Sequence, residues 1–168
     1  MLLKAQDIIV CTGSKGDEEI ILRALNIDLK QEEIIGIKGV RLSGKSTLAA
    51  VLSGYLEPES GQVTIQPTTN ISRGLVSLNN KLGKPSLFKK LLKKQGEFYT
   101  SLTELKFQLP NLLVIDDADN YPEKELKEII NQRTKSNNLT VLLSSDFDLI
   151  DRLCNQSYRL EYGRLVKE

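Results

Sequence analysis

The sequence predicts an α/β fold in which helices flank a mostly parallel sheet and an antiparallel β layer lies beside it. Three observations predict this architecture. Short apolar runs alternate with segments of helical periodicity, a glycine-rich loop joins one run to a helix, and residues 2–29 alternate apolar and polar positions around a turn. Strands that alternate with helices favour a parallel sheet with right-handed crossovers.

The antiparallel layer is predicted from the first part of the chain. Residues 2–10 and 18–29 contain alternating apolar positions, and Gly13 to Gly16 form a turn between them. Such a pair is typical of two antiparallel strands. A turn at residues 57–61 then leads to a half-buried strand over residues 62–65.

The later elements follow from the period of the apolar residues. A helix is predicted over residues 97–109, where Phe98, Leu102, Leu105 and Leu109 keep helical spacing. A second helix begins at Pro122 and directs Leu126, Ile129 and Ile130 inward. A short third helix is predicted over residues 149–153. Strands are predicted over residues 74–78, 112–115 and 139–143, and in a final hairpin of residues 158–160 and 165–166 that turns at Tyr162-Gly163.

Length and composition limit the number of domains and the class of protein. The chain has 168 residues, of which 40% are hydrophobic, so a single domain over residues 1–168 is expected. Its 23 basic and 22 acidic residues nearly cancel, so no overall field favours nucleic acid or a membrane as a partner, although local clusters leave both open. The sequence contains no histidine, which excludes imidazole bases and histidine metal ligands.

Two features of the sequence predict where the protein works. Cys11 and Cys154 lie far apart and form no C-x-x-C pair, which favours reduced thiols in a cytosolic protein. The sequence has no run of 18 apolar residues and does not begin with the apolar region of a signal peptide. We therefore expect the chain to remain inside the cell.

The most specific motif lies at residues 39–47, which match the phosphate-binding pattern G-x-x-x-x-G-K-S/T at every fixed position. The glycines let backbone N–H groups face the β-phosphate, Lys45 adds a positive charge, and the Ser46 hydroxyl can bind Mg²⁺. Before the motif comes an apolar run at residues 34–37. After it, apolar residues recur at helical spacing, namely Leu48, Val51, Leu52 and Tyr55.

A strand, this loop and a helix in that order predict a site for a nucleoside triphosphate. The amino end of the helix would direct free N–H groups and the positive end of its dipole at the phosphates. The residues expected to contact the nucleotide are Gly39, Arg41, Ser43, Gly44, Lys45, Ser46 and Thr47.

An acidic pair ends the strand predicted over residues 112–115. Asp116 would lie at the carboxyl edge of the sheet, where it could act on Mg²⁺, through water, because this ion gives up its hydration shell reluctantly. Asp117 is the candidate catalytic residue that orients an attacking water, although its side chain is one methylene shorter than the glutamate often used. The alternative is a pair of solvated carboxylates at a strand end.

With these motifs in this order, the chain resembles the nucleotide-binding domain of ATP-binding cassette (ABC) proteins. The segments that carry the resemblance are residues 27–29 with 33–37, 39–54 with 58–65, 112–117, and 158–166. The resemblance implies a phosphate-loop NTPase fold, MgATP as ligand, a partner nucleotide-binding chain and membrane permease subunits.

Several positions depart from the family pattern near the nucleotide. The family usually stacks adenine on an aromatic side chain near Cys11 and Thr12, and neither residue has a ring. Leu42 stands where the loop usually has a glycine, so the backbone there must accommodate a Cβ. Arg41 beside it is expected to contact phosphate or a partner.

Further departures affect the groups that the family uses for hydrolysis. Asn79 is the residue able to replace the glutamine that senses Mg²⁺, and it joins Ser46 and Asp116 as a candidate metal ligand. The signature sequence falls on residues 92–96 and loses its serine and adjacent glycines. The switch histidine falls on Ser145, which cannot act as a base at neutral pH. The resemblance therefore implies weak hydrolysis.

The segment between Asn79 and Leu92 has room for one short helix, whereas the family inserts a helical subdomain there, so this subdomain is largely missing. Apolar residues of the segment can share one helix face while lysines crowd the other sides over residues 84–94. Such a face could dock on an acidic partner, anionic lipid or nucleic acid. A core-packing helix with solvated lysines is an equal alternative.

Three functions are compatible with the sequence. The first is an ABC-type ATP-binding subunit of a transporter, cytoplasmic or peripheral at the inner face of the cell membrane, that forms a homo- or heterodimer and hydrolyses ATP weakly or not at all. The second is a replication-type AAA+ ATPase or loader, because residues 114–117 and 143–146 also resemble its acidic and sensor motifs. The third is a non-catalytic interaction module that retains a remnant of the phosphate loop.

Overall fold

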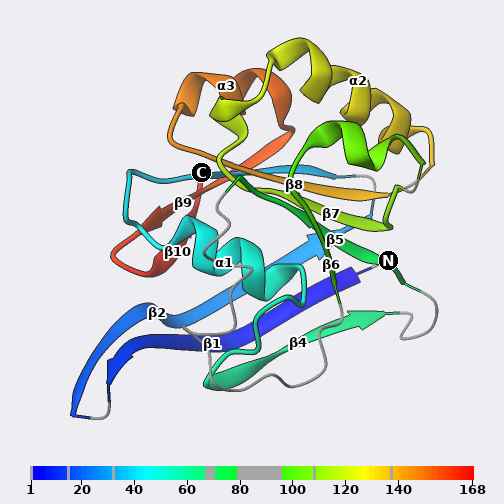
Figure 1. Cartoon of the computed structure of the whole chain (residues 1–168). Helices are drawn as coiled ribbons and strands as arrows, with labels where there is room; N and C mark the ends of the chain where they lie inside the picture. The colour runs from blue at the N-terminus through cyan, green and yellow to red at the C-terminus, as the bar shows by residue number, and fades with distance from the viewer. Residues whose placement is uncertain are drawn as a thin grey trace.

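The computed structural model describes residues 2–14, 16–31, 33–66, 71–78, 96–107, 109–136 and 138–168. In this part of the chain, two sheets make up the fold (Figure 1). The larger has seven strands in the order β10-β9-β3-β8-β7-β5-β6, and the smaller has three in the order β2-β1-β4. No helix among these residues is long and apolar enough to span a membrane.

The larger sheet is mostly parallel, as predicted. Every pairing from β9 through β3, β8, β7 and β5 to β6 is parallel, and only the hairpin of β9 with β10 is antiparallel. Its strands are β3 (Ile34–Lys38), β5 (Arg73–Val76), β6 (Glu97–Tyr99), β7 (Leu112–Ile115), β8 (Leu139–Ser144), β9 (Gln156–Glu161) and β10 (Arg164–Lys167).

The smaller sheet is the predicted antiparallel layer. It consists of β1 (Leu2–Ser14), which pairs with β2 (Asp17–Lys30) on one side and with β4 (Ser60–Gln66) on the other. Alternate residues of β1 and β2, such as Leu3, Val10 and Leu22, are fully buried, which explains the alternating pattern in the sequence.

Helices cover both faces of the larger sheet. The helix α1 (Lys45–Leu52) lies between the two sheets, whereas α2 (Glu123–Thr134) and α3 (Phe147–Leu153) cover the opposite face (Figure 1). Two short 3₁₀ helices, Leu102–Phe107 and Ala118–Asn120, complete the described elements. Two apolar clusters follow from this layering, one around α1 and the smaller sheet and one beneath α2 and α3. The side chains of Leu126 and Ile130 face the core from α2, as predicted.

The prediction of a helix over residues 97–109 is wrong. Residues 97–99 instead form β6 at the edge of the larger sheet, and residues 102–107 form a 3₁₀ helix. Backbone pairing with β5 and the contact between the Phe98 and Tyr55 rings, whose centroids lie 5.4 Å apart, hold the first residues extended. Leu102 and Leu105 are still buried. The apolar spacing therefore predicted correctly which of these side chains face the core, but it predicted the wrong type of secondary structure.

The predictions for Asn79, for the short helix that follows it and for the lysine-rich residues 84–94 lie outside the described residues. Of the signature counterpart at residues 92–96, only Gly96 is described.

Candidate nucleotide-binding site

The phosphate loop lies between β3 and α1, as predicted. Gly39 follows the last residue of β3, and its N–H donates to the carbonyl oxygen of Ser144 at the end of β8 (3.2 Å). Gly44 ends the loop with φ 98°, a left-handed conformation that favours glycine. A Cβ at Gly44 would lie 3.1 Å from Cγ2 of Ile21 in β2, so the smaller sheet touches the amino end of α1.

Lys45 holds the loop closed by bonds to its own backbone. Its side chain is buried, and Nζ donates to the carbonyl oxygens of Gly39 (2.8 Å) and Val40 (3.1 Å). An ammonium group has three donors, and these two bonds leave one of them for a phosphate. The loop is therefore shaped before a ligand arrives.

The tip of the loop is exposed. Leu42 has φ 67° and an exposed fraction of 96%, so the backbone adopts a conformation that glycine would favour even though a leucine stands there. Arg41 is also exposed, whereas Ser43, Ser46 and Thr47 are half-buried. The Ser43 hydroxyl oxygen is buried and has no hydrogen-bond partner among the described residues.

Asp116 is fully buried and directly follows β7 at its carboxyl end. Its Oδ2 accepts a hydrogen bond from the Ser77 hydroxyl (3.2 Å), while its buried Oδ1 has no partner within the described chain. Burial raises the pKa of Asp116 to about 6, the charge of Asp117 adds to the rise, and hydrogen bonds from the Ser46 and Ser77 hydroxyls oppose it. The influence of Ser46 on this pKa shows that two of the predicted metal ligands lie near each other.

These groups fit a magnesium–triphosphate ligand. Within the part of the chain that the structure describes, the loop offers a buried hydroxyl that lacks a partner, and the end of β7 offers a buried carboxylate oxygen that lacks one too. Unpaired buried polar atoms are costly, and a ligand that completes them removes the cost. Mg²⁺ is commonly held by one or two carboxylates together with substrate phosphates, and Asp116 is the carboxylate that the site offers.

Asp117 lies beside the site in a left-handed conformation, with φ 48° and ψ 52°. It is half-buried, and its charge contributes to the raised pKa of Asp116. Its assignment as the catalytic residue stays a prediction.

The Asp119 carboxylate is hydrogen-bonded to Ser145, a contact that was not predicted from the sequence. Asp119 accepts hydrogen bonds from the Ser144 hydroxyl (2.5 Å), from the Ser145 hydroxyl (3.2 Å) and from the Ser145 N–H (3.2 Å). Burial alone would raise the pKa of Asp119, but the hydrogen bonds from both serines outweigh it and lower the pKa. β7 and β8 are neighbours, so the loops after them meet at one edge.

Cys11 and Thr12 lie near the carboxyl end of β1. Neither residue has an aromatic ring on which a base could stack. Cys11 is half-buried, and its backbone N–H donates to the Glu59 carboxylate (3.1 Å). Burial and the charge of Glu59 raise the pKa of the Cys11 thiol, so it remains a neutral thiol.

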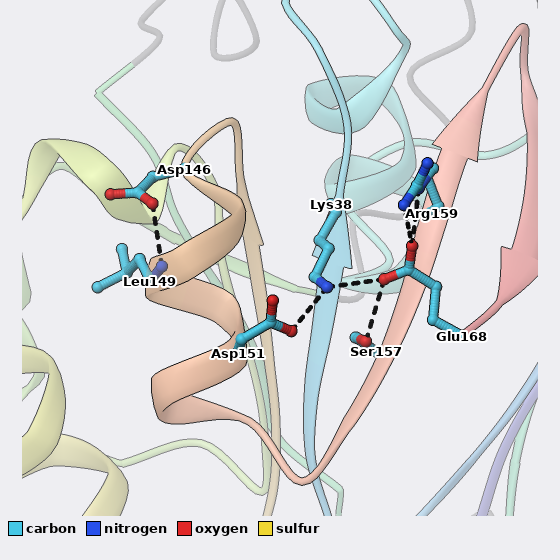
Figure 2. A network of polar contacts seen from close by, with 7 residues as sticks. All are labelled: Lys38, Asp146, Leu149, Asp151, Ser157, Arg159 and Glu168. Carbon is cyan, nitrogen blue, oxygen red and sulfur yellow. Dashed lines mark hydrogen bonds and ion pairs between the residues drawn. The ribbon is translucent and has the colours of Figure 1, made fainter.

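Behind the loop, a network of charges ties three elements together (Figure 2). Lys38 Nζ, on the last residue of β3, lies 2.6 Å from the Asp151 carboxylate of α3 and 2.7 Å from the Glu168 carboxylate. Glu168 also pairs with Arg159 of β9 at 2.5 Å. The network fixes the strand that carries the loop against α3 and the final hairpin.

The fold and the site define a phosphate-loop nucleotide-binding protein of the α/β class. The model of the ABC transporter family matches residues 22–139, more than half of the chain. The chain therefore belongs to the ABC transporter family.

Curated relatives and solved structures agree with this assignment. The cobalt import ATP-binding protein CbiO of Salmonella typhi is 32% identical over 118 residues, which are 68% of this chain and 40% of CbiO. The alpha-hemolysin translocation ATP-binding protein HlyB of Proteus vulgaris is 51% identical over 51 residues, 30% of this chain and 7% of HlyB. The chain thus spans less than half the length of these relatives.

Among solved structures, the fold is similar to the ATP-binding cassette MJ0796, a dimeric structure of a post-hydrolysis state bound to ADP and Pi. The TM-score is 0.70 at 14% identity, and the match covers 99% of this chain and 97% of that one. A structure of the ATP-binding subunit of an ABC transporter has a TM-score of 0.67 at 17% identity, covering 100% and 90%. These likenesses show the fold.

Proposed function

We propose that this chain is an ATP-binding subunit of an ABC transporter that binds MgATP at the loop of residues 39–47. The observation that supports it best is that two buried polar atoms of the site, Ser43 Oγ and Asp116 Oδ1, have no hydrogen-bond partner among the described residues. Both lie where a triphosphate and its metal would complete their hydrogen bonding.

Each residue of the site has a separate part in binding. The backbone of the loop and the amino end of α1 would face the phosphates, and Lys45 would supply the charge. Ser46 and Asp116 would hold Mg²⁺, which when bound neutralises charge on the phosphates. Asp116 has a raised pKa because it is buried, so a nearby cation would favour its charged form.

The proposed subunit hydrolyses ATP weakly on its own. Ser145 donates its hydroxyl hydrogen to Asp119, so this hydrogen is already engaged within the protein. Asp117 lies next to the proposed metal ligand, but an aspartate side chain is one methylene shorter than the glutamate often found in this role. Turnover by the isolated chain of one ATP per second or faster would contradict this part of the proposal, because about 1 per second is the low end of ordinary enzyme rates.

The decisive experiment is a calorimetric titration of MgATP into the wild-type chain and a Lys45→Ala variant. We expect measurable binding by the wild type and a loss of at least about tenfold in the variant, because a charged hydrogen bond to phosphate is worth about 1.5–3 kcal/mol. The matched control is Lys124→Ala, at an exposed position in α2, which should bind as the wild type does.

Equal affinity of wild type and Lys45→Ala, or no binding by either, would refute nucleotide binding at the loop. The second result would favour the interaction-module hypothesis. DNA-stimulated ATPase activity would instead favour the replication-type hypothesis.

We further propose that a second nucleotide-binding chain and membrane permease subunits are the partners, with the chain at the inner face of the cell membrane. The relatives named for import and translocation support this reading. Affinity capture from the native cell followed by mass spectrometry tests it, and permease subunits are the expected result. Replication proteins in their place would overturn it.

A further inference from the structure

The turn between β9 and β10 lies against the phosphate loop. A Cβ on Gly39 would lie 3.1 Å from the carbonyl oxygen of Leu160, in β9, and a Cβ on Gly163 would lie 2.3 Å from the carbonyl oxygen of Ile21. Ile21 also touches Gly44, and the Arg23 N–H donates to the Gly163 carbonyl (2.9 Å). The turn, β2 and the loop therefore meet at one place, in agreement with Figure 1.

Tyr162 occupies this turn in an unfavourable conformation. Glu161 pairs with Arg164, so Tyr162 and Gly163 form a two-residue hairpin loop, and their φ angles are 48° and 75°. Positive φ at both residues defines a type I′ turn, whose first position favours asparagine, aspartate or glycine. A bulky residue with positive φ is a true outlier.

Packing does not offset this strain. The Tyr162 side chain has an exposed fraction of 90%, and it is the one aromatic side chain classed as exposed among those the structure describes. Strain that no contact repays is found most often at functional positions. The turn thus presents an aromatic ring to solvent, and its Gly163 packs on Ile21, the residue of β2 that also touches Gly44 of the phosphate loop.

A nucleotide held at the loop by its phosphates would gain affinity from an aromatic surface for its base. With its phosphates at the amino end of α1, beside Ile21, the ribose and base would extend from the loop toward the neighbouring surface. The outer part of β1 offers Cys11 and Thr12, and neither has a ring. A base binds best to an aromatic face, and stacking is tolerant of which base is bound.

We propose that Tyr162 provides the stacking surface for the nucleobase of the bound nucleotide. This inference rests on the proposed function, because it assumes that phosphates bind at residues 39–47. Tyr162 then determines affinity for the base and leaves the affinity for phosphates unchanged.

The test compares MgATP with magnesium tripolyphosphate, which has the phosphates and lacks the base, in calorimetric titrations of wild type, Tyr162→Asn and Tyr162→Phe. Asparagine suits the left-handed turn, so Tyr162→Asn should melt at the same temperature as the wild type or higher. We expect it to bind MgATP about 5- to 100-fold more weakly. Tripolyphosphate affinity should not change, and Tyr162→Phe should bind both ligands as the wild type does.

The control is Val166→Ala, in the same hairpin at an exposed position away from the turn, which should bind both ligands normally. Wild-type affinity for MgATP in Tyr162→Asn, or an equal loss of both ligands, would overturn the inference and leave the proposed function standing. A wild-type chain that binds neither ligand would overturn the proposed function, and the inference with it.

Discussion

The Ser145 hydroxyl donates a hydrogen bond of 3.2 Å to Oδ2 of Asp119, while the Ser145 N–H donates to Oδ1 of the same carboxylate. The two residues lie in the loops that follow β8 and β7, so the carboxylate joins two neighbouring strand ends beside the phosphate loop. The Ser144 hydroxyl completes the set at 2.5 Å. One aspartate therefore fixes the loop in which the family resemblance places the switch histidine.

Asp119→Ala should destabilise the fold by about 1–3 kcal/mol, because three hydrogen bonds to a charged acceptor are lost. The pKa of Asp119 is lowered in the folded state, so its contribution is present above the unfolded value of about 3.8 and is lost as the pH falls through the folded pKa. Urea unfolding at pH 7 measures the loss. Asp148→Ala, an exposed aspartate in α3, is the control. Equal stability of the two variants would contradict the prediction.

Leu42→Gly should stabilise the free protein. Leucine at φ 67° carries the cost of the left-handed region, about 1–2 kcal/mol, and its exposed side chain gains little from burial. Glycine removes that cost, but it loses more backbone entropy on folding, which destabilises the folded state by about 0.5–1 kcal/mol. The net gain in stability is therefore about 0.5–1 kcal/mol.

Thermal unfolding of Leu42→Gly and Leu42→Ala separates the two causes. Alanine removes the side chain and keeps the Cβ, so it should show no gain. An equal rise for both variants would mean that the exposed leucine itself, and not its backbone conformation, is unfavourable.

The parts of the site that could be predicted from the sequence are those fixed by local spacing. The loop needs glycine, lysine and serine at set positions between a strand and a helix, and residues 34–52 supply all of them along one stretch of chain. Asp116 was predicted for the same reason, because it directly ends an apolar run. The antiparallel layer followed from its period of two.

The parts that could not be predicted depend on which strands become neighbours. Asp119 meets Ser145 only because β7 and β8 are adjacent, and the turn at Tyr162 reaches the loop only because β9 pairs with β3. The spacing of residues along the chain does not determine which strands become neighbours in the sheet. The strand β6 was missed because apolar residues three and four apart fit a helix equally well as a short strand followed by a 3₁₀ turn.

Arg133 gives a third prediction, because it is fully buried near the end of α2 without a carboxylate partner among the described residues. Its guanidinium donates to the carbonyl oxygens of Pro110 (2.6 Å) and Leu139 (2.7 Å) and to the Thr140 hydroxyl (2.7 Å). Burial lowers the pKa of Arg133 to about 10, so it remains charged at neutral pH.

Arg133→Met should cost about 2–4 kcal/mol in the free energy of unfolding, since it leaves buried carbonyl oxygens without a donor. Chemical denaturation measures the cost. Arg152→Met, which removes an exposed arginine from an ion pair with Glu123, should cost less than about 1 kcal/mol. Similar losses in both variants would show that the buried bonds of Arg133 add little.

The network behind the phosphate loop gives a prediction in which pH is the variable. Lys38 is buried, and hydrogen bonds to Asp151 and Glu168 raise its pKa. The hydrogen bond with Lys38 is in turn the largest cause that lowers the pKa of Glu168. Replacing Lys38 by methionine keeps the apolar stem of the side chain and removes the charge that both carboxylates share.

Lys38→Met should therefore be less stable than the wild type by about 1–3 kcal/mol at pH 7, with most of the loss coming from Glu168 because Asp151 is 57% exposed. The Glu168 contribution is present above the unfolded pKa of about 4.5 and is lost as the pH falls through its lower folded pKa. The Lys38 contribution is complete below about pH 10.5 and is lost only as the pH rises through a still higher folded pKa.

The difference in unfolding free energy between variant and wild type should thus be constant between about pH 5 and 10 and shrink below about pH 4.5. Urea unfolding across this range measures it, with Lys124→Met as the exposed control, and a difference that persists undiminished at pH 3 would mean that lost packing, and not lost charge, destabilises the variant.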